Sequence, residues 1–357
     1  MKRLTWLAVF AILACADPAH AVPDSVYAGI NERAVQQHIL PRYGQLAVAT
    51  GKLDAAAKTF CAAPAVDKLD AVRKTYNEVE DAWQNIQHVR FGPAANASRA
   101  DRFAFWPDPR NIIGKQMAAL LAKRDAAALV PEKFAHASVA LQGLPALERL
   151  VFTDQAEKLT AKSVEAVFRC QYLQAIAGNL AAMATQIDHE WRDGASAFAT
   201  RMTQPNGTPY RDPREANVDL FKSLYFAVEL AADHKLARPL GGSAQEARPH
   251  LAESWRSLRS LRNLQLNLEA ARNLYLTAFA PAMPDKGTAE GIRASFDEAI
   301  AAANEITLPL ENAVQDGKAR PAVEKLARSI VALKKILLHL LPAELDIPVG
   351  FNALDGD

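Results

Sequence analysis

Helical periodicity runs through almost the whole chain from Pro23 onward, and it is the feature that most limits the possible folds. Apolar residues recur at the spacing of one helix face, and no run of alternating β-branched residues predicts a strand. Most of the 20 prolines lie between the periodic segments, where a missing N–H does not break a helix. The pattern predicts an all-α protein with helices at 24–49, 67–90, 110–123, 132–141, 144–152, 160–191, 212–237, 247–279, 288–315 and 319–341.

The main break in this pattern lies between residues 193 and 213, and its most turn-rich part is 204–209. Each side of the break holds enough helix for a bundle, and short loops favour antiparallel neighbours. We therefore expect two tandem antiparallel helical bundles, an N-terminal one at 22–195 and a C-terminal four-helix bundle at 210–345, followed by a tail at 346–357.

The N-terminal segment 1–21 predicts a secretory signal peptide. Residues 1–3 carry two positive charges, 4–14 are apolar, and 19–21 (Ala-His-Ala) match a cleavage site, so export to the periplasm is expected. The alternative is an outer-membrane lipoprotein, because the residues before Cys15 loosely resemble a lipobox. We favour plain cleavage, since this lipobox has a leucine at an unusual position.

The charge balance argues against nucleic acid as a partner. Cleavage would remove Lys2, Arg3 and Asp17, so Lys plus Arg falls from 41 to 39, Asp plus Glu falls from 40 to 39, and the net charge becomes zero. A nucleic-acid or membrane surface is bound electrostatically through a basic face. No later apolar run is long enough for a bilayer span, so lipidation of Cys15 is the one membrane contact that the sequence suggests.

Two cysteines, Cys61 and Cys170, remain after the predicted cleavage. An oxidising compartment allows them to pair, and we expect one disulfide between the first helical region and a helix far along the chain. The alternative is two buried free thiols, because the sequence alone does not give the separation of the two Cα atoms.

The stretch 142–152 has the pattern of a helix start. Gly143 permits a tight entry, Pro145 suits the first helical turn, and an apolar stripe follows. Glu148 lies beside this stripe. It is either a solvent-facing helix residue or part of a site.

Residues 83–110 combine aromatic and arginine side chains in a segment that includes an irregular loop. Asp108 followed by Pro109 predicts a helix start, with an N-cap and then a proline at the first helical position. That local role does not explain why Arg90, Arg102 and Trp106 gather nearby. The segment either packs as a lid on a bundle end or lines a pocket.

Complete catalytic motifs are not found. His189 and Asp193 have the spacing of a zinc peptidase helix, but that motif needs a second histidine where Asp193 stands, and Gly194 ends the helix. The remaining histidines are scattered. We therefore predict no catalytic residues and favour a binding protein over an enzyme.

Several motifs, taken in order, resemble the imelysin-like family. The resemblance covers nearly the whole chain after the predicted signal peptide. It rests on Trp83 running into Phe91-Gly92-Pro93, on Phe105-Trp106-Pro107-Asp108, on Gly143-Leu144-Pro145-Ala146-Leu147-Glu148, on Phe168-Arg169-Cys170 through Leu180, and on Glu253-Ser254-Trp255 through Leu268.

The resemblance implies two helical bundles, a periplasmic or outer-membrane-associated location and a link to iron uptake. The family motif is G-x-H-x-x-E, whose His and Glu contribute to a metal or ligand site. Gly143 and Glu148 match this motif, but Pro145 stands in the place of the histidine. Since proline offers no nitrogen donor, a metal site of the usual kind is not expected, and zinc is disfavoured.

A small polar or anionic ligand, such as an iron chelate, suits the remaining residues better than a bare cation. Envelope iron-uptake proteins are the expected macromolecular partners. Two alternatives stay open, a metallopeptidase of the imelysin type and a structural or interaction protein without a ligand. The predicted ligand-binding residues are Glu148, Gly143, Trp83, Arg90, Arg102, Trp106 and Asp108.

Overall fold

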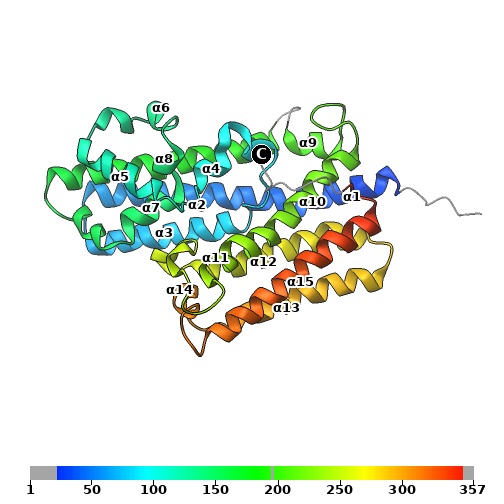
Figure 1. The fold of residues 1–357 in the computed structure, drawn as a ribbon. Helices are drawn as coiled ribbons and strands as arrows, with labels where there is room; N and C mark the ends of the chain where they lie inside the picture. Colours follow the sequence, from blue (N-terminus) through cyan, green and yellow to red (C-terminus); the bar gives the residue numbers. More distant parts are fainter. Residues whose placement is uncertain (1–21, 194–196, 349–357) are drawn as a thin grey trace, which may run out of the picture.

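The computed structural model describes residues 22–193 and 197–348, and its regular structure is helical (Figure 1). No β-strand occurs within these ranges, which confirms the predicted all-α class. None of the helices in this part of the chain combines the length and apolarity needed to cross a bilayer. The predicted signal peptide with Cys15, and the end of the predicted tail from residue 349, lie outside the described residues.

One long helix begins the fold and takes part in both halves of the molecule. It consists of α1 (Asp24–Ala34), a π-helical turn (Val35–Ile39) and α2 (Leu40–Ala62). In Figure 1 the α1 part lies beside α10, whereas α2 lies between α3 and α8. This helix extends beyond the predicted end at residue 49, because Leu53, Ala57 and Phe60 continue its buried stripe.

The first bundle is built around α2, and its other members cover that helix from several sides. Short helices close the outer face of the bundle in Figure 1. The elements are α3 (Val66–Gln84), α4 (Arg99–Phe103), α5 (Ile112–Lys123), α6 (Pro131–Phe134), α7 (Gly143–Val151) and α8 (Val164–Arg192).

The second half has four long helical units, together with α1 and short connecting helices. The long α15 buries an apolar stripe, with Val323, Leu326 and Ile330 fully inaccessible, and it lies along α13 (Figure 1). The elements are α9 (Phe198–Thr203), α10 (Pro213–Glu229) with a π-helix (Leu230–Leu236) and α11 (Ala237–Leu240), α12 (Ser260–Leu274) with a π-helix (Tyr275–Phe279), α13 (Lys286–Asn304), α14 (Leu310–Ala313) and α15 (Arg320–Leu345).

Side-chain caps explain where three of the longer helices begin. The Ser163 hydroxyl accepts from the N–H of Ala166 at 3.1 Å and starts α8. The Asp212 carboxylate accepts from Glu215 at 2.9 Å and starts α10, with a proline in the first turn. Asp285 does the same for α13. Each cap satisfies backbone donors that have no partner within the helix.

The expected disulfide is present. Cys61, near the end of α2, is bonded to Cys170 in α8, and their Cα atoms are 5.6 Å apart. The bond joins the two central helices of the first bundle across 109 positions of sequence.

The predicted helix at 247–279 is wrong over its first part. The chain from residue 241 to 259 is irregular, with 3-10 turns at Pro249–Leu251 and Trp255–Ser257. Ser254 and Leu258 have left-handed backbones, with φ of 50° and 56°, which an α-helix does not accommodate. Similarly, α3 ends at Gln84 and not at residue 90. Both irregular segments border the candidate site.

Candidate functional site

Glu148 is buried between the two halves of the molecule, so it is not a solvent-facing helix residue. Its side chain is 3% exposed. Its Oε1 accepts hydrogen bonds from the backbone N–H and the hydroxyl of Ser257, at 2.9 and 2.8 Å. Its Oε2 lies 3.8 Å from the Arg256 guanidinium. The irregular segment 241–259 thus reaches across from the second half to hold the carboxylate of α7.

Gly143 allows α7 to sit against α4. Its φ is +79°, a conformation that L-residues rarely adopt but that glycine, which has no Cβ, adopts readily. A Cβ at this position would lie 2.4 Å from the carbonyl oxygen of Phe103 and 2.5 Å from that of Arg102. Gly143 therefore has a positioning role. It places the start of the helix that carries Pro145 and Glu148.

A cavity of about 100 Å³ lies beside Glu148. Its walls come from α3, from the segment after α4, from α7, and from the irregular segment of the second half. Chemically they combine carboxylates, guanidinium groups and two indole rings. The lining includes Glu80, Gln84, Trp106, Pro107, Asp108, Pro109, Pro145, Glu148, Arg149, Arg238, His250, Glu253, Ser254, Trp255 and Arg256.

Three arginines bring positive charge to this cavity, and they come from different elements. Arg149 follows Glu148 in α7, Arg238 lies in α11, and Arg256 lies in the irregular segment. The Arg256 guanidinium stands 4.2 Å from the centre of the Trp255 ring, so a cation–π contact orients it.

Asp108 lines the cavity, but its oxygens are occupied by the backbone. They accept from the N–H groups of Ile112 and Ile113 at 2.7 and 2.9 Å. The predicted placement of the helix start is wrong, because α5 begins at Ile112 and Pro109 lies outside it. Asp108 nevertheless satisfies free donors at the helix start, as a capping residue does.

A buried polar network joins the two bundles next to the cavity, and three of its residues, Glu80, Gln84 and Glu253, line that cavity. Lys235 donates to Gln84 Oε1 at 2.7 Å and to Glu253 Oε2 at 2.6 Å. Gln84 donates to Glu80 at 3.0 Å and to Glu253 at 3.1 Å. Asn263 also donates to Glu253, at 3.1 Å. All five residues are at most 7% exposed.

Burial of these groups away from water alters their proton affinities. Burial raises the pKa of Glu148 to about 7, with a smaller contribution from Glu80. The Ser257 hydrogen bonds and the charge of Arg256 oppose that increase. Burial likewise raises the pKa of Glu80 and lowers that of Lys235. Glu148 is therefore poised to exchange a proton near neutral pH.

Glu148→Gln is expected to gain stability relative to the wild type as the pH rises from 5 to 8. The folded protein, with its raised pKa, binds this proton more tightly than the unfolded chain, so ionisation of Glu148 opposes folding above pH 4.5 and most strongly above pH 7. Glutamine keeps an acceptor for Ser257 but does not ionise. The relative gain in the free energy of unfolding should be roughly 2 kcal/mol, measured by urea denaturation.

The control for this comparison is Glu269→Gln, at an exposed position of α12 outside the cavity lining. It should follow the wild-type pH dependence. If the free energies of unfolding of Glu148→Gln and the wild type changed in parallel from pH 5 to 8, Glu148 would be ionised throughout that range, contrary to its raised pKa.

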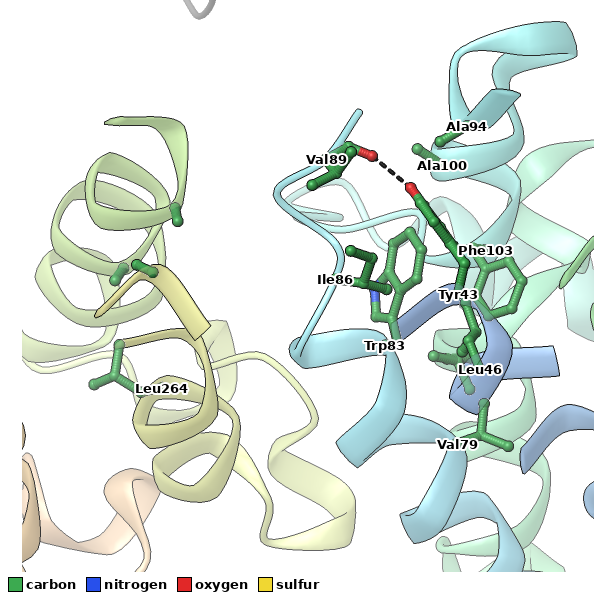
Figure 2. Packing of buried hydrophobic residues seen from close by; sticks show 14 of the residues in the cluster. Tyr43, Leu46, Val79, Trp83, Ile86, Val89, Ala94, Ala100, Phe103 and Leu264 are labelled. Atoms are coloured by element: carbon green, nitrogen blue, oxygen red, sulfur yellow. Dashed lines mark hydrogen bonds between the residues drawn. The ribbon is translucent and has the colours of Figure 1, made fainter. Parts of the chain in front are cut away.

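The structure brings three of the predicted ligand-binding residues together at the cavity and places four elsewhere. Trp106, Asp108 and Glu148 line it. The other four lie outside its lining. Trp83 stacks on Phe103 in the core, with ring centres 4.7 Å apart (Figure 2), and Arg90 lines a neighbouring cavity of about 400 Å³. Arg102 donates to Gln142 and Asn179, and Gly143 contacts the backbone of α4.

Sequence reasoning missed the polar network itself. A signal was present, because Glu80 and Gln84 are one turn apart on the apolar stripe of α3, as are Asn263 and Asn267 on that of α12. Polar residues on a buried stripe need hydrogen-bond partners, so each pair indicates a polar contact with another part of the chain. Lys235 carried no such signal, since it lies in a π-helical stretch where the helical register changes.

Fold and site together define a class of protein, an all-helical chain of two bundles with a cavity lined by charged and aromatic side chains where the bundles meet. The family model described as Imelysin matches residues 39–337. The chain belongs to the imelysin family.

Three relatives illustrate the similarity. Iron-regulated protein A of Synechococcus elongatus is 22% identical over 245 residues, which are 68% of this chain and 62% of that protein. An imelysin-like protein from Psychrobacter arcticum has a TM-score of 0.76 at 20% identity, covering 93% of this chain and 99% of its own. A putative iron-regulated protein A precursor from Parabacteroides distasonis has a TM-score of 0.70 at 17% identity, covering 89% and 97%. The structural matches support the fold.

The metal that the family motif implies does not fit the residues of this site. Pro145 lines the cavity at the histidine position, and Glu148 Oε1 already accepts two hydrogen bonds. The buried histidines His38 and His88 bond to each other at 2.9 Å and do not line this cavity. Across the described ranges, no three His, Cys, Asp or Glu side chains are grouped so as to hold a metal ion.

Proposed function

We propose that this imelysin-family protein is an exported, periplasmic binding protein that holds a small anion in the cavity beside Glu148. The anion is a carboxylate or phosphate group, either free or as one arm of an iron chelate. The observation that carries the proposal is that Arg149, Arg238 and Arg256 line the same small cavity as Glu148.

The hydrogen-bonding state of the lining supports an anion over a cation. The cavity carboxylates of Asp108, Glu80 and Glu253 already accept hydrogen bonds from protein donors. Arg238, by contrast, is exposed and forms no ion pair among the described residues. Arg256 stacks on Trp255, and its one ion pair there is the 3.8 Å contact with Glu148. Guanidinium groups bind carboxylate and phosphate through paired donors.

The cavity volume limits what enters. About 100 Å³ is well below the several hundred that drug-sized ligands occupy. A carboxylate or phosphate group fits this space, but a whole chelate does not. A chelated iron would therefore stay at the mouth, with one acidic arm inside.

The biological setting of the proposal comes from the relatives and from the N-terminus. Two relatives are named iron-regulated protein A, and one of them is described as a precursor. Residues 1–21 have the signal-peptide pattern. An accessory role in iron uptake, with envelope proteins of that process as partners, agrees with both.

Calorimetric titration with citrate, phosphate and ferric citrate tests the proposal. We expect one of these anions to bind at a single site, and Arg256→Met to weaken binding about tenfold or more because one charge-assisted hydrogen bond is lost. Arg262→Met is the matched control, since Arg262 lies outside the cavity lining and pairs with Asp81. Equal affinities of the two variants, or no binding by the wild type, would contradict the proposal.

A further inference from the structure

Lys235 is a fully buried cation at the junction of the two bundles. Its side chain is 2% exposed, and its ammonium group is held by Glu253 Oε2 and Gln84 Oε1. Burying a charge is costly unless oppositely charged or polar groups surround it. The buried ammonium therefore needs compensating partners, and the neighbouring acidic groups provide them.

The carboxylates around Lys235 are the groups that would otherwise attract a cation. Glu80 and Glu253 are both buried, and they line the same cavity as Glu148. Carboxylate and amide oxygens are the donors that hard divalent ions prefer. The ammonium of Lys235 already engages the Oε2 of Glu253 and the amide oxygen of Gln84, which are two such donors.

The π-helical stretch explains how Lys235 reaches this position. It spans Leu230–Leu236 between α10 and α11. A π-helical turn contains an extra residue, so the residues after it are rotated by about 100° relative to an uninterrupted α-helix. Lys235 lies within this π-helical stretch, so the change in helical register determines where its side chain points. Irregular turns of this kind are frequent at functional sites.

We infer that Lys235 is a specificity-determining residue that acts as a built-in cation, so that the site excludes divalent metal ions and accepts anions. A metal ion would compete with the ammonium for the same oxygens and would be repelled by its charge. Pro145 removes the nitrogen donor and Lys235 occupies oxygen donors, so two separate features disfavour a metal. This inference rests on the proposed anion site, but metal binding is measured in an experiment separate from anion binding.

Titration with MnCl₂ alone, followed by calorimetry and by the electron paramagnetic resonance of free Mn²⁺, tests the inference. The wild type should show no saturable binding up to about 1 mM. Lys235→Met should bind one Mn²⁺ at least about tenfold more tightly than the wild type, because the oxygens of Glu253 and Gln84 are released. Lys235→Met combined with Glu253→Gln should lose that binding.

Lys334→Met is the matched control. It removes a partly buried lysine that is paired with Asp233 at 2.6 Å and forms no hydrogen bond with Glu253 or Gln84 among the described residues, so it should behave as the wild type. If Lys235→Met does not fold, as judged by circular dichroism, Lys235→Gln takes its place, and the wild-type titration remains informative in either case.

Two results would overturn the inference. One is saturable Mn²⁺ binding by the wild type that Glu253→Gln abolishes. The other is a folded Lys235 variant that binds Mn²⁺ no better than the wild type. If the wild type bound neither Mn²⁺ nor citrate or phosphate, the proposed anion binding would be wrong, but the exclusion of metal ions would still hold.

Discussion

Replacing Gly143 with alanine is expected to lower the free energy of unfolding by about 3 kcal/mol or more. Two effects add at this position. The backbone has a φ of +79°, and the new Cβ would meet two carbonyl oxygens at 2.4 and 2.5 Å. Neither contact is with a flexible side chain that is able to move aside. Relief requires that α7 shift away from the segment Arg99–Phe103.

Urea denaturation of Gly143→Ala measures this effect, and Gly51→Ala serves as the matched control. Gly51 lies within α2, where a Cβ would have nothing within 4 Å. Alanine is a better helix former than glycine, so the control should gain about 0.5 to 1 kcal/mol. If Gly143→Ala were as stable as the wild type, the close approach of α7 to α4 would be wrong.

Loss of the disulfide is expected to cost about 4 kcal/mol of stability. Cys61 and Cys170 are 109 positions apart, and cross-linking so long a loop restricts the unfolded chain strongly. The bond also fixes the end of α2 against the first turns of α8. The double variant Cys61→Ala/Cys170→Ala should therefore unfold at a much lower urea concentration than the wild type.

A reducing agent provides the control for that prediction. Dithiothreitol should destabilise the wild type by about the same amount and leave the double variant unaffected, since neither of its paired cysteines remains. An unfolding midpoint that did not depend on the reducing agent in either protein would show that the two thiols are not joined.

Helical periodicity predicted most of the fold because burial of a regular stripe is a property of the local sequence. The C-terminal helix shows this well, since Val323, Leu326, Ile330, Leu333 and Leu337 are all fully inaccessible. The segment 241–259 was not predictable in the same way. Its left-handed residues and its hydrogen bonds to Glu148 depend on the opposite bundle, and a local pattern does not report that partner.

The candidate site was predictable in part for a related reason. Glu148 stood out through the motif, and Trp106 and Asp108 through an unusual local composition. The buried partners Lys235 and Glu253 come from two further segments, and only the tertiary structure brings them together. Trp83 and Arg102 were expected at the cavity because of the same aromatic and arginine-rich composition, but their side chains pack into the core or bond to α8 and Gln142.

Proton uptake on binding is the most direct test of whether an anion binds next to Glu148. At pH 8 Glu148 is mostly ionised, because its pKa is about 7. An anion placed beside it raises that pKa further, so binding should be accompanied by uptake of a fraction of a proton.

Calorimetric titration of the wild type with the bound anion, at pH 8 in buffers of different ionisation enthalpy, measures this uptake. We predict net uptake by the wild type, none by Glu148→Gln, and weaker binding by the wild type as the pH rises from 6 to 8. Binding without proton uptake, with the same pH dependence in both proteins, would contradict the account.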